Sequence, residues 1–195
     1  MKMNRNGERM SQAGVGAWMI AVLVPAMLIA CWNDYRSHRV PNGLNAALAL
    51  AGLAAHGWLG GLPGLWHSAA GLAVGFGLLF GLWLVRGMGA GDVKFMAALG
   101  AWLGPQLTLY AVIAGGLVGG VMALAMILVR GRWRESFFNL GILVTKCSSV
   151  RTALSDFGSA RSFAGQAGMM PYAIPLTIGT SIVMVGSYTG WWGIL

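Results

Sequence analysis

Two aspartates stand beside long apolar segments in a chain that otherwise carries little charge. Only 9% of the 195 residues are charged. Asp34 ends one apolar run, and Asp92 begins another. Ionisable groups at a membrane are costly and usually functional. Two carboxyl groups that share a site can share one proton, so that one acts as general base and the other as general acid. Such a pair suits hydrolysis of a peptide bond without a metal or a covalent nucleophile.

The other titratable residues do not form a recognisable site. Three acidic residues lie in polar or mixed segments and are interpreted as solvated charges: Glu8, Glu135 and Asp156. Cys31 and Cys147 belong to no CxxC pair, and the three histidines lack the spacing of metal ligands. We therefore expect neither a metal nor another cofactor.

The residues around Asp92 allow two interpretations. In "MGAGDVKFMAALG", Gly89 and Gly91 remove side chains beside Asp92, so that another backbone or a peptide can approach. The alternative is that Asp92 caps the helix that follows, where a negative charge is favoured. We favour a functional role because Asp34 is expected to face Asp92. Lys94 is interpreted as an interfacial anchor or as a cation that tunes Asp92.

The elements that must position the two aspartates are membrane helices. The chain is 57% hydrophobic, whereas soluble domains carry roughly 25% charged residues. About 20 apolar residues cross a bilayer core as a helix. The sequence predicts an all-α, polytopic membrane helix bundle in one domain, residues 1–195, with about six transmembrane helices. The predicted spans are residues 13–32, 43–59, 68–85, 93–103, 107–129 and 171–192, of which the fourth is short.

Basic residues predict which ends of these helices face the cytoplasm. The net charge is +8. Ten of the 13 basic residues follow the first, third and fifth spans, and six of these lie in residues 130–170. The positive-inside rule makes that side cytoplasmic, including residues 130–170, and places Asp34 and Asp92 together on it. The N-terminal segment disagrees, because it carries Lys2, Arg5 and Arg9; a start at Met10 would resolve the conflict.

The positive charge indicates lipid rather than nucleic acid as the partner. No basic stretch is interleaved with aromatic residues that could stack on bases. Basic loops of membrane proteins contact anionic lipid headgroups. We therefore expect contact with membrane lipids and no nucleic acid.

Three segments together resemble the type 4 prepilin peptidase family, the GxGD aspartic proteases. They are "NDYRSHRVPNGLN" (33–45), "GAGDVKFMAALGAWLG" (89–104) and "MPYAIPLTIG" (170–179). The resemblance implies that Asp34 and Asp92 are catalytic. It also implies supporting roles for Gly89, Gly91 and Lys94 of the GxGD-x-K signature and for Pro41 and Asn42 of the Val-Pro-Asn turn. The implied substrate is a prepilin or pseudopilin with a basic leader, cut at the cytoplasmic face of the bacterial inner membrane.

Within this family the chain is similar to the short, peptidase-only branch found in Flp/Tad pilus systems. Long members carry an additional N-terminal region with cysteine pairs and also methylate the new N-terminus. The chain begins directly with its first apolar run and has no such pair. The resemblance therefore implies cleavage of Flp-like prepilins without methylation.

Two alternatives remain open at the level of sequence. A transporter or assembly subunit could use Asp34 and Asp92 as an ion or proton relay, although polar residues are sparse within the spans. A presenilin-type intramembrane protease shares GxGD, but the basic loop and Val-Pro-Asn turn after Asp34 favour a prepilin peptidase. The oligomeric state is not indicated.

Overall fold

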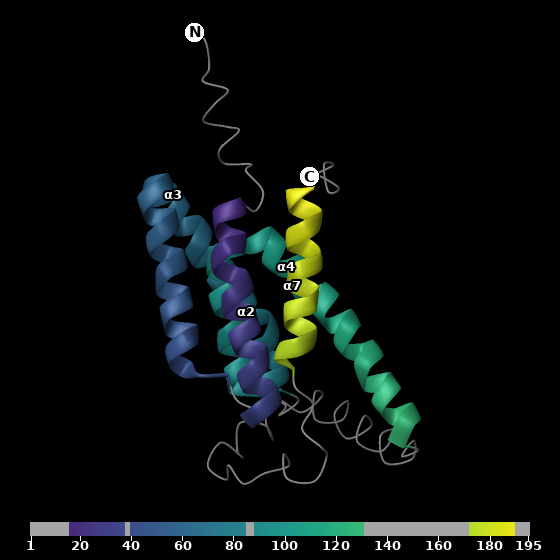
Figure 1. The fold of residues 1–195 in the computed structure, drawn as a ribbon. Helices are drawn as coiled ribbons and strands as arrows, with labels where there is room; N and C mark the ends of the chain where they lie inside the picture. Colours follow the sequence, from purple (N-terminus) through teal and green to yellow (C-terminus); the bar gives the residue numbers. More distant parts are fainter. Residues whose placement is uncertain (1–15, 38–39, 85–87, 131–171, 190–195) are drawn as a thin grey trace.

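The protein is described here by a computed structural model that covers residues 16–37, 40–84, 88–130 and 172–189. The described residues form the helices α2 (Ala17–Ser37), α3 (Asn42–Leu84), α4 (Ala90–Arg130) and α7 (Ala173–Tyr188) (Figure 1). No strand is present among these residues. The predicted all-α helix bundle is therefore confirmed. The predicted cytoplasmic segment, residues 130–170, lies outside the described residues apart from Arg130, as does the N-terminal tail.

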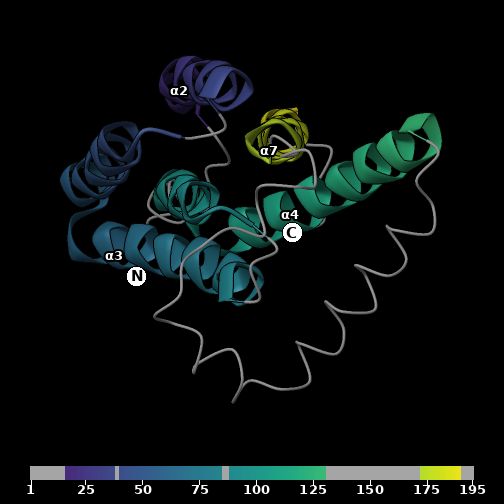
Figure 2. The ribbon, with the colours of Figure 1, turned by 90° about the horizontal axis from the view of Figure 1, so that it is seen from below.

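Both long helices double back on themselves at a glycine. α3 has 43 residues and α4 has 41 residues. A straight helix of that length would extend ~60 Å, about twice the thickness of a bilayer core. Gly61 has φ 59° and Gly104 has φ 75°, a backbone region that side chains disfavour, and Pro63 and Pro105 follow closely. Each helix therefore consists of two limbs, and the second limb of α4 slopes away from the first in Figures 1 and 2.

The described part of the chain has four labelled helices instead of six, but α3 and α4 each comprise two helical segments on either side of a kink. The interruptions predicted after residues 59 and 103 coincide with the bends at Gly61 and Gly104. The backbone angles of Gly61 and Gly104 are not helical, so each glycine ends one helical segment and the next segment begins directly after it. The predicted span 93–103 lies in the first limb of α4. By length and composition, three described helices can cross a membrane, namely α2, α3 and α4, while α7 is shorter.

α4 lies at the centre of the described bundle, because it packs against both α3 and α7. The helices approach closely at pairs of glycines. A Cβ atom on Gly71 of α3 would collide with the carbonyl oxygen of Gly100, and a Cβ atom on Gly179 of α7 would collide with the backbone of Gly115. Small residues allow such close backbone contact between membrane helices. The first limb of α4 supplies much of the core, including Phe95, Met96, Leu99 and Trp102.

Several helix ends lie at one end of this bundle, the lower end in Figure 1. Among them are the C-terminal end of α2 and the N-terminal ends of α3, α4 and α7. α2 continues to Ser37, beyond the predicted end at residue 32, so Asp34 lies inside its last turn. The two aspartates are thus placed at the same end of the bundle, as the sequence predicts.

Candidate active site

Asp34 is buried between α2 and the start of α7. Its residue is 4% exposed, and its Oδ2 atom accepts a hydrogen bond of 2.9 Å from the backbone N–H of Ala173. Ala173 is the first residue of α7, where N–H groups have no partner within the helix. Asp34 therefore caps a helix that lies far away in the sequence. The positive end of the α7 dipole favours a negative charge on this carboxyl group.

Asp92 is buried in the first turn of α4, with 8% of the residue exposed. Its side chain folds back onto Gly89 and has a hydrogen bond to the backbone of that residue. The carboxyl group also interacts electrostatically with Asp34, so the structure brings the two predicted catalytic residues together. Because α4 begins at Ala90, Asp92 follows the cap position, and its contact with Gly89 resembles the return bond of a capping box. The capping and functional interpretations of Asp92 are thus compatible.

The two glycines of the motif leave room for different neighbours. A Cβ atom on Gly89 would lie 3.0 Å from the Asp92 Oδ2 atom. A Cβ atom on Gly91 would lie 3.5 Å from the backbone N and O atoms of Val40. Gly89 therefore makes space for the carboxyl group itself, whereas Gly91 adjoins the segment that leads into α3.

The start of α3 supports the motif through two side chains. The Asn42 Oδ1 atom accepts a hydrogen bond of 3.1 Å from the Lys94 Nζ atom. The Asn45 Nδ2 atom donates a hydrogen bond of 3.1 Å to the Gly91 carbonyl oxygen. The Pro41 carbonyl oxygen accepts a hydrogen bond of 3.2 Å from the Asn45 N–H, which starts α3. Lys94 therefore joins α4 to α3, a role that neither interpretation from the sequence included.

Three groups at the site were not predicted as site residues. The Ala173 N–H is a backbone donor and has no signature in the sequence. Tyr172 precedes α7, is partly buried and interacts electrostatically with Asp92. Asn45 is 4% exposed. A polar residue within an apolar run is the signal by which Asn45 could have been found.

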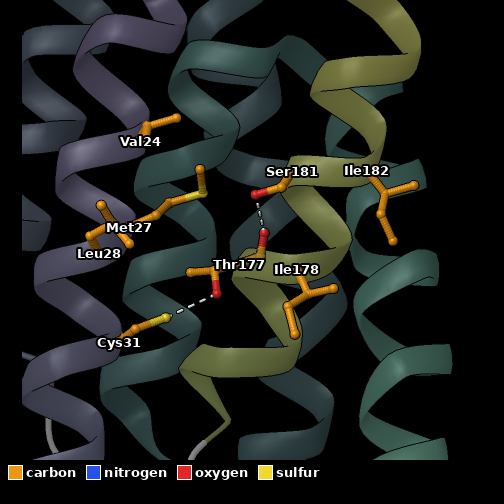
Figure 3. A pocket seen from close by; sticks show the side chains of 8 residues that line it. All are labelled: Val24, Met27, Leu28, Cys31, Thr177, Ile178, Ser181 and Ile182. Atoms are coloured by element: carbon orange, nitrogen blue, oxygen red, sulfur yellow. Dashed lines mark hydrogen bonds between the residues drawn. The ribbon is translucent and has the colours of Figure 1, made fainter.

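An apolar groove between α2 and α7 begins one helical turn from Asp34 and Ala173. It has a volume of about 330 Å³, and its lining residues are Val24, Met27, Leu28, Cys31, Thr177, Ile178, Ser181 and Ile182 (Figure 3). Cys31 and Thr177 face each other across its lower end, with 3.0 Å between the Sγ and Oγ1 atoms. The groove thus forms an apolar surface beside the site, which neither aspartate lines.

Three of the described helices are long and apolar enough to cross a membrane, and two buried carboxyl groups lie at one end of the bundle. These features define a membrane protein with a candidate acid–base pair. The sequence pattern of the type IV leader peptidase family matches residues 21–124, more than half of the chain. The chain belongs to this family, which confirms the resemblance found in its motifs. Asp34 and Asp92 both lie within the matched residues.

Several curated relatives carry the name prepilin leader peptidase/N-methyltransferase. The protein of Burkholderia pseudomallei (strain 1026b) is 37% identical over 108 residues, which are 50% of this chain and 35% of the relative. The protein of Aeromonas hydrophila is 34% identical over 120 residues, 57% of this chain and 41% of the relative. The chain thus matches well under half the length of these relatives. No solved structure matches it significantly.

Proposed function

We propose that the protein is a membrane aspartic endopeptidase that removes the basic leader of type IV prepilins or pseudopilins, with Asp34 and Asp92 as its catalytic residues. The observation that carries this proposal is the burial of both carboxyl groups at one end of the bundle, within electrostatic reach of each other. Family membership and the names of the curated relatives support the substrate class.

The surroundings of the two carboxyl groups support different roles for them. Asp34 accepts the Ala173 N–H at the positive end of α7, which favours a carboxylate. We assign Asp34 as the general base and a protonated Asp92 as the general acid. Two carboxyl groups this near each other resist double ionisation, which keeps one proton on the pair.

The reaction then proceeds by proton transfers between the pair, one water molecule and the peptide. Asp34 takes a proton from water as the water oxygen bonds to the carbonyl carbon, and Asp92 protonates the carbonyl oxygen. In the second step Asp34 gives its proton to the amide nitrogen, and Asp92 takes a proton from one hydroxyl of the intermediate. The carbon–nitrogen bond breaks, leaving a carboxylic acid and an amine, and the pair returns to its starting state.

The finer substrate proposal is a Flp-like prepilin cut at the cytoplasmic membrane face. The three motif segments support the prepilin substrate class, and the basic loops support the cytoplasmic orientation. We propose that the active site faces the cytoplasm of the bacterial inner membrane, where the basic leader of an unprocessed pilin is located. Membrane lipids surround the helices.

Replacing each aspartate with asparagine tests the proposal. Each variant can be compared with the wild type by co-expressing a Flp-like prepilin and following the gel shift of the leaderless product. We expect Asp34→Asn and Asp92→Asn each to reduce cleavage by on the order of 10²-fold or more, because an amide cannot transfer the catalytic proton. Asp156→Asn is the matched control, since Asp156 is interpreted from the sequence as a solvated charge.

Membrane fractionation of each variant shows whether it is inserted. Asparagine retains the size of aspartate, so both catalytic variants should be present at the wild-type level. Processing at near wild-type rate by Asp92→Asn would leave Asp92 with only its structural role at the start of α4. No processing by the wild-type protein would contradict the proposal as a whole.

A further inference from the structure

Asn45 is placed to fix the backbone next to Asp92. It lies in the first turn of α3, and its Nδ2 atom donates a hydrogen bond of 3.1 Å to the Gly91 carbonyl oxygen. That carbonyl group belongs to the peptide unit between Gly91 and Asp92. The N–H of the same peptide unit donates a hydrogen bond of 3.2 Å to the Gly89 carbonyl oxygen. Both polar atoms of the unit are therefore held, one from within the motif and one from α3.

This peptide unit controls where the Asp92 carboxyl group lies. Rotation of the unit would move the Asp92 Cα atom and change the position of its carboxyl group relative to Asp34. Glycine at position 91 provides no side chain to resist such a rotation, because it is the least restricted residue of the backbone. A hydrogen bond from a second helix restores that resistance without filling the space beside Val40.

The fold alone does not account for an asparagine at this position. The residue is 4% exposed, and its Oδ1 atom has no hydrogen-bond partner among the described residues. A buried polar atom without a partner costs free energy, which an apolar side chain of similar size would avoid. The Gly91 carbonyl group lies in the first turn of α4, where a helical carbonyl oxygen accepts the N–H four residues ahead. It therefore does not depend on Asn45 for a hydrogen-bond partner.

We propose that Asn45 is a positioning residue for the acid–base pair, holding the peptide unit before Asp92 so that the carboxyl group keeps its position relative to Asp34. This inference rests on the proposed function for its kinetic consequence. Its structural part, the restraint of the motif backbone, is independent of what the protein cleaves. A small displacement of the carboxyl group is sufficient for such an effect, because a misplacement of about 1 Å can reduce a rate by on the order of 10²-fold.

Two replacements remove the donor in different ways. Asn45→Leu takes away both polar atoms and keeps the volume. Asn45→Asp keeps the shape and, as a carboxylate, has no N–H to donate to Gly91. Ser68→Ala is the matched control, because the Ser68 Oγ atom also donates from α3 to an α4 carbonyl oxygen, that of Ala101, at 2.6 Å and away from the site.

Kinetics on a purified prepilin separate positioning from binding and stability. We expect kcat to fall by about tenfold or more in both Asn45 variants, with KM changed by less than about threefold, because substrate contacts remain while the carboxyl geometry is lost. Ser68→Ala should keep kcat near the wild-type value even if its melting temperature falls. If Asn45→Leu does not insert into the membrane, Asn45→Asp alone decides the outcome.

Amide hydrogen exchange of the purified full chain gives a readout that needs no cleavage. We expect faster exchange in the segment containing residues 88–95 for the Asn45 variants and not for Ser68→Ala. Unchanged exchange in that segment, or kcat near the wild-type value in both variants, overturns the inference. If the wild type itself does not cleave prepilin, the proposed function fails, and the exchange result still decides whether Asn45 restrains the motif.

Discussion

At the scale of single residues, the site depends on two carboxyl groups whose surroundings differ. Asp34 is held by a backbone donor from α7, and Asp92 folds back onto the start of its own helix. If the two work as one acid–base unit, their losses do not add. The double variant with Asp34→Asn and Asp92→Asn should therefore cleave prepilin about as fast as the less active of the two single variants. A further large loss in the double variant, measured in the same prepilin assay, would show that the two residues act separately.

The motif glycines give a second prediction at this scale. Alanine at position 89 places a Cβ atom 3.0 Å from Asp92 Oδ2, so the carboxyl group must shift. Alanine at position 91 places its Cβ atom 3.5 Å from the Val40 backbone, an ordinary contact. We expect Gly89→Ala to lose about tenfold or more in cleavage rate, and Gly91→Ala to lose much less. Equal losses in the two variants, at equal amounts of inserted protein, would contradict this account.

At the scale of elements, the bends in α3 and α4 have different steric surroundings. Gly61 has φ 59° and nothing within 4 Å of an added Cβ atom, whereas Gly104 has φ 75° and the His67 ring in that place. Backbone conformations of this kind cost other residues about 1–3 kcal/mol. Gly61→Ala should lower the free energy of unfolding by about that amount, and Gly104→Ala should lower it further through the collision with His67.

Thermal unfolding in detergent micelles measures this difference. The melting temperature of Gly104→Ala should lie below that of Gly61→Ala, and both should lie below the wild-type value. Gly77→Ala is a suitable control, because an added Cβ atom there has nothing within 4 Å and the helix is regular. A wild-type melting temperature for Gly104→Ala would show that the bend tolerates a side chain.

Much of the element structure could be predicted from the sequence, because the long apolar runs mark the helices. Long uncharged segments can only be membrane helices, and the two acids beside them indicated the site. The joining of predicted spans into α3 and α4 could not be predicted, because "GGLPGLWH" and "GPQ" have the composition of loops. A single glycine with positive φ in each of them is enough to separate two helical segments, which follow each other without a longer loop. The contacts of Asn45 and the Ala173 N–H were also inaccessible, since they depend on how separate helices pack.

At the scale of the whole molecule, the distribution of charge predicts orientation. Basic residues lie near the end of the bundle that carries Asp34 and Asp92, among them Arg36 and Lys94, while the bends at Gly61 and Gly104 carry none. The positive-inside rule then places the site at the cytoplasmic face and the bends outside. Alkaline phosphatase, which is active only outside the cytoplasm, should be active when fused at either bend.

Fusions at residues 38–39 and 85–87 should be inactive, because these positions connect the helix ends at the candidate site. A cytoplasmic reporter such as β-galactosidase, fused at the same positions, should give the opposite pattern. Strong phosphatase activity at residues 38–39 would reverse the orientation and place the aspartates on the outer face, where an unprocessed basic leader is not expected.

The hydrogen bond between Asp34 and the first residue of α7 has a consequence for biosynthesis. A ribosome makes α2, α3 and α4 before α7, so a nascent chain that has inserted residues up to Arg130 already contains both carboxyl groups. It still lacks the Ala173 donor that holds Asp34. Asp34 acquires this donor only when α7 enters the membrane beside α2. The candidate site is therefore completed late in synthesis, so under the proposed function a growing chain could not yet cleave the proteins around it.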